Sequence, residues 1–443
     1  MQYYSTNGKA PIADLEKAVV KGLAEDRGLY MPQEIKRLPK VFFDNIQDMK
    51  FQDIAYNVAS AFFGEDVDGD ALQDLVYDTL SFDCPVVKVT DSIYSLELFH
   101  GPTLAFKDVG ARFMARLLGY FLRKGGNSDK TVNVLVATSG DTGSAVANGF
   151  LGVEGIHVYV LYPKGKVSPI QECQFTTLGK NITAIEVDGV FDDCQALVKS
   201  AFMDEELNQH MKLTSANSIN VARFLPQAFY YFNAYARMKQ QGLADNLVMC
   251  VPSGNFGNIC AALFGHAMGL PVKRFIAANN ANDIFFKYLQ TGKYEPKPSV
   301  QTLANAMDVG DPSNFARIIN LYSENGQLTD VATHHRITNL ISGATYSDEQ
   351  IRATMRQCFE QTKYVLDPHG ACGYQALADG LLPGEVGVFC ETAHPAKFKE
   401  KVDDILGIDV EIPARLRAFM EGEKQSVAMS KDFADFKQYL LKQ

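Results

Sequence analysis

Short apolar runs recur through the middle of the chain, and each leads into a loop rich in Gly, Ser, Asn or Thr and then into a helix-like segment. The clearest runs are VNVLVA (132–137), HVYVLY (157–162), ITAIEV (182–187) and LVMCVP (247–252). A strand covered on both faces needs apolar side chains throughout, so this repeat predicts an α/β protein with parallel sheet covered by helices. Ligands of such sheets bind beyond the carboxyl ends of the strands, which makes the loops after these runs the candidate site.

The periodicity of apolar residues divides the chain into three parts. Residues 1–80 show mostly helical spacing and predict a small helical N-terminal domain. Residues 81–407 contain the strand, loop and helix units and predict an α/β catalytic region of two subdomains around a cleft. Residues 408–443 form a C-terminal extension.

Composition narrows the class of protein. The net charge of -10 comes from 52 acidic and 42 basic residues without a long block of either sign, so a nucleic-acid partner is not expected. The eight cysteines include no CxxC pair, which is typical of a protein of the reducing cytoplasm and gives no sign of a metal site. The start of the chain does not resemble a signal peptide, and no apolar run reaches the roughly 18 residues of a membrane span.

One lysine, Lys107 in HGPTLAFKD (100–108), directly follows small and apolar residues and precedes an amphipathic helix pattern. Desolvation by Leu104 and Phe106 and the positive end of the helix both disfavour the charged form of its amine. Both effects favour a neutral, nucleophilic amine. The alternative is a snorkelling lysine paired with Asp108.

Three loops supply groups that bind anions or polar substrates. SGNFGN (253–258) follows an apolar run and opens a helix, where glycines and free N–H groups favour a phosphate. TSGDTGS (138–144) offers hydroxyl donors, although ordinary helix capping explains it as well. Ser218, Asn220 and Arg223 form a candidate anion clamp, with a surface arginine as the alternative. Together with a lysine nucleophile, these loops fit a carbonyl cofactor held through its phosphate.

Seven motifs of the chain resemble those of the threonine synthases. They are, in order, HGPTLAFKD, ATSGDTGSA, YPKGKVSPIQE, SANSIN, VPSGNFGN, NAMDVGDPSN and TAHPAKF, and the resemblance runs from GLAEDRGLYMP near the N-terminus. It implies the tryptophan-synthase-β-like fold of pyridoxal 5′-phosphate enzymes. It also implies a lyase that converts O-phospho-L-homoserine and water into L-threonine and phosphate by γ-elimination and β-hydration, the last step of threonine biosynthesis.

The resemblance implies roles for individual residues of this sequence. Lys107 would bind the cofactor covalently and move protons, and Thr392 would face the pyridine nitrogen. The cofactor phosphate would be held by Gly254, Asn255, Phe256, Gly257 and Asn258. The substrate would contact Thr138, Ser139, Gly140, Asp141, Thr142, Ser218, Asn220 and Arg223. The family usually has a small residue before the threonine, whereas this chain has Glu391, so the packing beside the ring is not implied.

Three other functions stay open at this point. A phospholyase or deaminase of the same fold would share most of these motifs and release a 2-oxo acid. A non-catalytic metabolite-binding protein would keep the fold without the chemistry. The third alternative, an α/β nucleotide-binding transferase, has less support, because neither GxxxxGK[ST] nor GxGxxG occurs at the loops. We expect a cytoplasmic monomer or homodimer whose partner is a small-molecule substrate.

Overall fold

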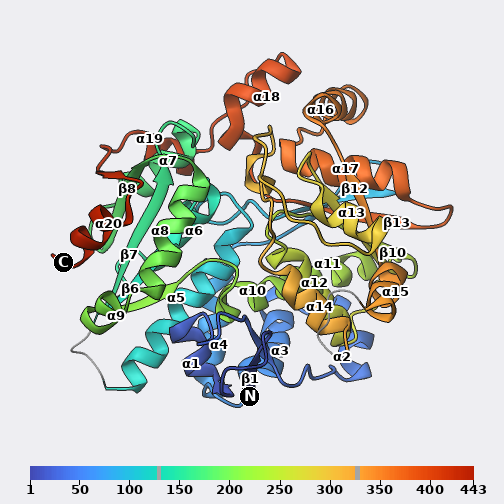
Figure 1. Cartoon of the computed structure of the whole chain (residues 1–443). Helices are drawn as coiled ribbons and strands as arrows, with labels where there is room; N and C mark the ends of the chain where they lie inside the picture. The colour runs from blue at the N-terminus through green and yellow to red at the C-terminus, as the bar shows by residue number, and fades with distance from the viewer. Residues whose placement is uncertain (127–130, 325–329) are drawn as a thin grey trace.

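The computed structural model describes residues 1–126, 131–324 and 330–443, and it contains two large sheets, one in each half of the view (Figure 1). The first has six strands in the order β12-β11-β10-β13-β5-β4, all parallel to their neighbours except β4. Its strands are β4 (Val86–Lys88), β5 (Ile93–Glu97), β10 (Leu247–Pro252), β11 (Arg274–Asn279), β12 (Ile341–Thr345) and β13 (Val386–Glu391).

The second sheet has five parallel strands in the order β14-β8-β7-β6-β9. Its strands are β6 (Val132–Ala137), β7 (Ile156–Pro163), β8 (Ile182–Asp188), β9 (Lys212–Ser215) and β14 (Val427–Ser430). The fold predicted from sequence, with two parallel sheets, is confirmed.

Helices cover both faces of the five-stranded sheet because side chains of its strands alternate between two apolar clusters. In β6, Val134 and Val136 pack into the main core, whereas Leu135 and Ala137 pack into a separate cluster. The main-core face is covered by α6 (Asp141–Phe150) and α7 (Pro169–Thr176), with α5 (Lys107–Lys124) packed on α6. The other face is covered by α8 (Phe191–Met203) and α20 (Phe433–Leu440).

The six-stranded sheet is covered in the same way. One face packs against α17 (Pro368–Gly380), α16 (Asp348–Thr362) and α18 (Lys399–Leu406). The other face packs against α11 (Ala228–Gln240) and α12 (Gly257–Ala267). The remaining helices of this part are α9 (Glu205–His210), α10 (Val221–Phe224), α13 (Ile284–Thr291), α14 (Phe315–Tyr322), α15 (Val331–Leu340) and α19 (Ala414–Met420).

The sequence predicted a helical N-terminal domain, but the structure has a small sheet there in addition to the helices. It contains α1 (Leu15–Lys21), α2 (Lys40–Asn45), α3 (Phe51–Phe63) and α4 (Gly69–Thr79). It also contains an antiparallel sheet of β1 (Gln2–Ser5), β2 (Ala13–Asp14) and β3 (Tyr30–Pro32) in the order β2-β1-β3. Strands of two to four residues are too short to show an alternating pattern in the sequence.

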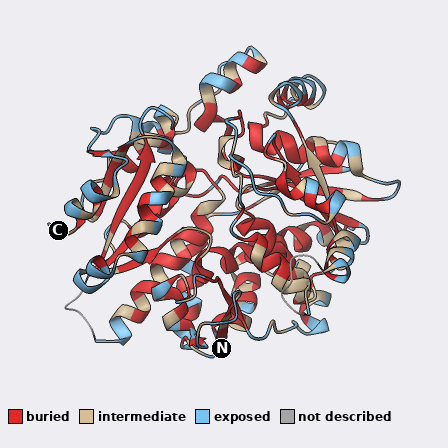
Figure 2. Cartoon of the chain, in the orientation of Figure 1, coloured by how far each residue is buried: buried red, intermediate tan, exposed pale blue. Residues whose placement is uncertain are grey.

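The C-terminal segment completes the five-stranded sheet, since β14 pairs with β8 and α20 packs against α8. The division of the chain at residues 80 and 407 stays a prediction. The interior is shared between the parts, because one apolar cluster joins the N-terminal helices to both sheets, and Figure 2 shows both sheets largely buried. Among the described residues, no helix is long and apolar enough to cross a membrane.

A buried arginine, Arg317 in α14, ties the N-terminal part to the α/β region. Its Nη2 donates to the carbonyl oxygens of Tyr30 and Ile219 at 2.9 and 2.6 Å, and its Nη1 donates to that of Ser218 at 3.2 Å. The guanidinium also lies 4.1 Å from the ring centre of Phe224. One side chain therefore satisfies three backbone carbonyls from two distant segments.

We expect Arg317→Met to lower the stability by about 3 kcal/mol, since it leaves buried carbonyls without donors. The thermal midpoint should fall by roughly 5 °C, which differential scanning calorimetry measures. Arg352→Met is the matched control, because Arg352 lies 3.6 Å from exposed Asp404 and such pairs contribute little. Equal midpoints for the two variants would contradict the role given to Arg317.

Candidate active site

A central cavity of about 110 Å³ lies where the loops after β6, β10 and β13 meet. The carboxyl ends of parallel strands gather here, as expected for an open α/β sheet. The residues predicted from sequence that line it are Lys107, Ser139, Thr142, Ser218, Arg223, Gly254, Asn255, Phe256, Gly257, Asn258 and Thr392. Tertiary structure therefore brings together residues that lie almost 300 positions apart in the chain.

Lys107 is the first residue of α5 and faces the cavity. The residue before it is fixed, because the Phe106 N–H donates to the carbonyl oxygen of Thr392 at 2.8 Å. Asp108 does not pair with Lys107; it accepts from the N–H and hydroxyl of Thr103 at 2.9 and 2.6 Å. The alternative of a Lys107–Asp108 surface pair is therefore wrong.

The environment of Lys107 favours a neutral amine. Burial is the largest effect and lowers the pKa of Lys107 to about 8, with Arg223 and Lys397 acting in the same direction and Asp141 opposing them. At pH 7 roughly a tenth of the amine is then neutral, far more than for an exposed lysine. Lys107 is thus able to act as a nucleophile and a base.

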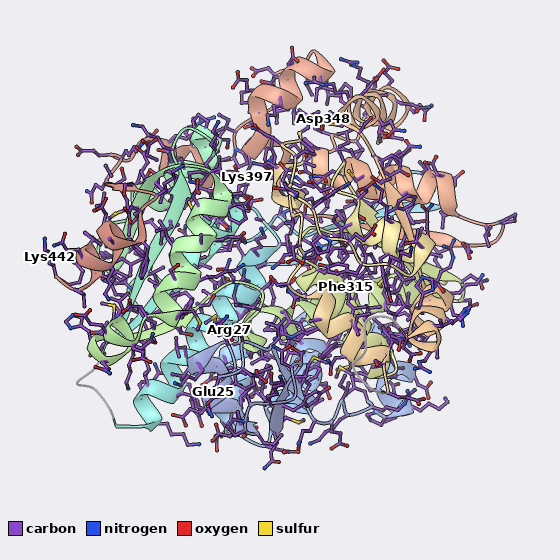
Figure 3. The ribbon with its side chains drawn as sticks, viewed as in Figure 1. Glu25, Arg27, Phe315, Asp348, Lys397 and Lys442 are labelled. Atoms are coloured by element: carbon purple, nitrogen blue, oxygen red, sulfur yellow. The ribbon has the colours of Figure 1, made fainter. Side chains whose placement is uncertain are left out.

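A second buried lysine, Lys397, was not singled out from the sequence. Its Nζ lies 2.6 Å from Asp141 Oδ1 and donates to the carbonyl oxygen of Thr103 at 2.8 Å. Figure 3 shows Lys397 between the two halves of the molecule. Burial alone would raise the pKa of Asp141, but Lys397 and Lys107 lower it, so the carboxylate is ionised. The sequence offered the same indication of a buried lysine as for Lys107, because Lys397 stands among apolar neighbours in HPAKF (394–398).

The 254–258 loop has the shape of an anion site. Phe256 has a left-handed backbone with φ 67°, a conformation that costs a residue other than glycine about 1–3 kcal/mol and that clusters at functional sites. A Cβ at Gly254 would lie 2.8 Å from the Ala306 carbonyl oxygen, and one at Gly257 would lie 2.7 Å from Ser218 Cβ. Within the described residues, the N–H groups of residues 254–256 have no hydrogen-bond acceptor. The loop therefore presents free backbone donors.

The two asparagines of this loop shape it rather than reach into the cavity as free donors. Asn255 Nδ2 donates to Ser218 Oγ at 2.9 Å, and Asn255 Oδ1 accepts from the Ser313 N–H at 2.7 Å. Asn258 Nδ2 donates to the Pro252 carbonyl oxygen at 2.8 Å. Binding of an anion here would depend on backbone N–H groups and the helix dipole of α12.

Arg223 provides an unpaired positive charge. It is almost fully buried, and its Nε donates to the Ala216 carbonyl oxygen at 2.6 Å, whereas Nη1 has no partner among the described residues. Burial lowers the pKa of Arg223 to about 10, which still leaves it cationic at neutral pH. Because a buried unpaired guanidinium is costly, this cavity wall favours an anionic ligand.

The hydroxyl-rich loop is only partly in the cavity. Ser139 and Thr142 line it, whereas Thr138, Gly140 and Asp141 do not. Thr138 Oγ1 accepts from the Gly140 N–H at 2.9 Å, and Gly140 has φ 145°, so both shape the turn. The N-cap of α6 is Gly140, which has no side-chain cap bond, so capping by Ser139, Asp141 or Thr142 does not explain the loop. Asp141 is engaged with Lys397 instead.

Asn220 is placed away from the cavity, contrary to the expected clamp. It is the N-cap of α10, where its Oδ1 accepts from the Ala222 N–H at 3.0 Å. Its Nδ2 donates to the carbonyl oxygens of Val19 and Ser215 at 2.9 and 3.2 Å. Every polar atom of this amide is used, because capping α10 requires the side chain to point back toward the helix.

Two histidines near the cavity differ in position. His394 Nδ1 accepts from the Ala396 N–H at 3.0 Å, and burial lowers the pKa of His394 to about 4, so this histidine is neutral and holds the turn after β13. His369 lines the cavity but was not singled out from the sequence. The available signal was DPH at the start of α17, where Asp367 caps the helix.

These groups fit a phosphorylated carbonyl compound. A partly neutral amine can react with a carbonyl carbon, and the free N–H groups of the 254–258 loop can accept a phosphate. Arg223 Nη1 remains for a second anion. The arrangement matches the cofactor and the phosphorylated substrate expected from the sequence.

Comparison with known families gives the same result. The model described as "Pyridoxal-phosphate dependent enzyme" matches residues 86–391, about two thirds of the chain. A model of the threonine synthase N terminus matches residues 2–80, and one of the threonine synthase C-terminal region matches residues 370–440.

Individual relatives match over the whole chain. The threonine synthase of Haemophilus influenzae is 43% identical, with 100% of both chains covered. The crystal structure of threonine synthase from Escherichia coli is 42% identical, with a TM-score of 0.92 and 100% of both chains covered. The pyridoxal-phosphate-bound threonine synthase from Brucella melitensis is 32% identical, with a TM-score of 0.92 and 100% and 99% of the two chains covered.

The lowered pKa of Lys107 has a consequence for stability in the absence of ligand. The folded protein must bury the protonated amine below pH 8, whereas the unfolded chain is protonated up to about pH 10.4, so stability rises with pH between these values. We expect ligand-free Lys107→Met to be more stable than the parent by on the order of 2–3 kcal/mol below pH 8. The difference should fade toward pH 10.5, as followed by thermal melting. A difference independent of pH would show that the amine is not desolvated.

Proposed function

The chain belongs to the threonine synthases of the pyridoxal-phosphate-dependent enzyme family, and we propose on this premise that its central cavity converts O-phospho-L-homoserine and water into L-threonine and phosphate. The observation that carries the proposal is the placement of Lys107, with a pKa of about 8, in one cavity with the free N–H groups of the 254–258 loop. An amine and an anion site in one wall suit a cofactor that has both an aldehyde and a phosphate.

The cofactor would be held at three points. Lys107 would bind its aldehyde carbon, and the loop of Gly254, Asn255, Phe256, Gly257 and Asn258 would hold its phosphate through backbone N–H groups. Thr392 would face the pyridine nitrogen, where a hydroxyl does not keep the nitrogen protonated as a carboxylate would. When bound, pyridoxal phosphate supplies an electron sink that stabilises negative charge on the substrate carbons.

Lys107 would also move protons. Once released from the cofactor, its neutral Nζ can take the proton from Cα of the substrate and can return protons on the same side of the cavity. A proton is lost from Cβ as phosphate leaves from Cγ, a proton is then added at Cγ, and water adds its hydroxyl at Cβ while a proton returns to Cα. One amine with a pKa of about 8 can serve as base and then as acid near neutral pH.

The substrate would bind between the 138–142 loop on one side of the cavity and Arg223 and Ser218 on the other. Ser139 and Thr142 would donate to its amino-acid end, because their hydroxyls line the cavity. Arg223 and Ser218 would bind its phosphate, since Arg223 Nη1 has no partner among the described residues. Thr138, Gly140, Asp141 and Asn220 would act indirectly, by shaping the loops that carry these donors.

Lys397 would keep Asp141 ionised and in place beside Lys107. A carboxylate there partly offsets the desolvation of the lysine, because it favours the charged amine. The two opposing effects would hold the pKa near the working pH rather than far below it.

We further propose that the protein acts in the cytoplasm as a monomer or a homodimer, with no nucleic-acid partner. All eight cysteines are free and seven are buried, which suits a reducing compartment.

The decisive assay supplies O-phospho-L-homoserine to the purified protein with pyridoxal phosphate. We expect threonine and phosphate in equal amounts, and we expect Lys107→Ala to abolish turnover while the protein remains folded. Reduction with borohydride followed by peptide mapping should place the cofactor on Lys107 in the parent. Mainly 2-oxobutanoate would instead support a phospholyase or deaminase, and no reaction with no bound cofactor would support a binding protein.

The role of Arg223 is tested by Arg223→Gln, which keeps most of the side-chain volume and removes the charge. We expect kcat/KM for O-phospho-L-homoserine to fall about 100-fold, because a buried charge pair with the substrate phosphate contributes about 2–5 kcal/mol. The absorbance of the bound cofactor should be kept. Arg336→Gln is the control, since Arg336 lies on α15 outside the cavity wall. A loss of cofactor absorbance with unchanged kcat/KM at saturating cofactor would contradict this assignment.

A further inference from the structure

Three buried polar side chains form a row at the edge of the cavity, and no role described above explains them. Glu391 ends β13, Asp367 is the N-cap of α17, and His369 lies in the first turn of α17. Each is at most 1% exposed. The Asp367 N–H donates to Glu391 Oε1 at 3.1 Å, and Asp367 Oδ2 lies 2.5 Å from His369 Nδ1.

Both ring nitrogens of His369 are engaged, and this fixes the position of the ring proton. The Ala306 N–H donates to His369 Nε2 at 3.1 Å, which requires Nε2 to be unprotonated. The proton is therefore on Nδ1, where it is donated to Asp367. A ring held at both nitrogens cannot turn without breaking a buried hydrogen bond.

The row contains two carboxyl groups, and one of them is neutral. Burial raises the pKa of Glu391, and the neighbouring Asp367 raises it further. Burial also opposes ionisation of Asp367, but the hydrogen bonds that its carboxylate accepts from His369 Nδ1 and from the Gly370 N–H lower the pKa of Asp367. Negative charge therefore resides on Asp367 rather than on Glu391.

The space around Glu391 is built for this side chain. A Cβ at position 370 would lie 2.0 Å from Glu391 Oε2, so Gly370 is required beside it. Within the described residues Oε2 is buried and has no hydrogen-bond partner, which disfavours a charge on this carboxyl group. The glutamate before Thr392 is thus accommodated by a specific partner and a specific glycine.

The row ends at the wall that supports the 254–258 loop. Ala306 and Met307 line the cavity beside Gly254, whose Cβ, if present, would be 2.8 Å from the Ala306 carbonyl oxygen and 2.9 Å from Met307 Cα. Any shift of the Ala306 backbone would therefore move the surface on which Gly254 packs. At its other end the row joins Thr392, because Glu391 precedes it in the chain.

The surrounding segment, residues 302–309, has an independent anchor. Asp308 Oδ1 accepts from Asn280 Nδ2 at 2.9 Å and from the Thr302 hydroxyl at 2.7 Å. Asp308 Oδ2 accepts from the Thr302 N–H at 3.0 Å. Loss of the His369 bond would thus loosen Ala306 without releasing the whole segment.

We propose that Asp367 and His369, backed by Glu391, are positioning residues that hold Ala306 against the 254–258 loop and thereby set how long pyridoxal phosphate stays bound. The identity of the ligand rests on the proposed function. The row acts on the backbone of the phosphate seat and takes no part in the proton transfers assigned to Lys107.

Two substitutions of His369 separate its two hydrogen bonds. The amide of His369→Gln can reach the place of Nε2 and accept from Ala306, whereas the shorter amide of His369→Asn can reach only the place of Nδ1. Each purified holoenzyme is diluted into a scavenger of free pyridoxal phosphate, and the loss of bound-cofactor absorbance gives the release rate.

We expect His369→Asn to release the cofactor about tenfold faster than the parent and His369→Gln to stay within about threefold of it. His335→Asn, on the exposed side of α15, should not change the rate. A release rate for His369→Asn equal to that of the parent overturns the proposal. Equal acceleration by both substitutions, with equally lowered melting midpoints of the cofactor-free forms, also overturns it, because it shows a general packing role.

Glu391→Gln tests whether the row of Glu391, Asp367 and His369 needs an uncharged side chain at position 391. Its amide oxygen can still accept from the Asp367 N–H, and the side chain carries no charge, so we expect a release rate within about threefold of the parent. An acceleration of tenfold or more would show that Glu391 acts as a carboxylate and would overturn its place in the row. If the parent protein binds no pyridoxal phosphate on Lys107, the proposed function fails instead, so the two failures are distinguishable.

Discussion

The desolvation of the Lys107 amine is the constraint on which the rest of the site depends. It requires α5 to begin inside the molecule, and the hydrogen bond from the Phe106 N–H to Thr392 fixes that start against the end of β13. It also requires opposing charges nearby, which the buried Asp141–Lys397 pair supplies. A lysine poised between its charged and neutral forms is a product of both sheets, because each contributes one side of its surroundings.

The anion-binding features show how stability is given up for function. Phe256 has a strained left-handed backbone, and Arg223 keeps a buried nitrogen without a partner within the described residues. Both are unfavourable in the free protein, and a bound phosphate would offset their cost. The row of Glu391, Asp367 and His369 lies directly behind these features and holds the backbone that shapes them.

Much of the fold and part of the site could be predicted from local sequence. Strands β6 and β10 have the bounds given by their apolar runs, because a strand buried on both faces is apolar throughout. The short strands β1 to β3 were missed, since two to four residues show no period. We predicted that Asn220 binds the substrate because Ser218 and Arg223 lie near it in the sequence, but Asn220 caps α10. Lys397 was missed because its partners, Asp141 and Thr103, lie far away in the sequence. His369 was missed although Asp367 lies only two residues before it.

The sequence by itself determined the parallel α/β architecture, the candidate lysine and the glycine-rich loop, since these depend on apolar periodicity and backbone freedom within a few residues. Only the tertiary structure decided which polar groups meet. It paired Asp141 with Lys397, left the buried Arg223 Nη1 without a partner among the described residues, and placed Glu391 against Asp367. Burial and charge act through space, so the pKa of a side chain depends on neighbours that the order of residues does not reveal.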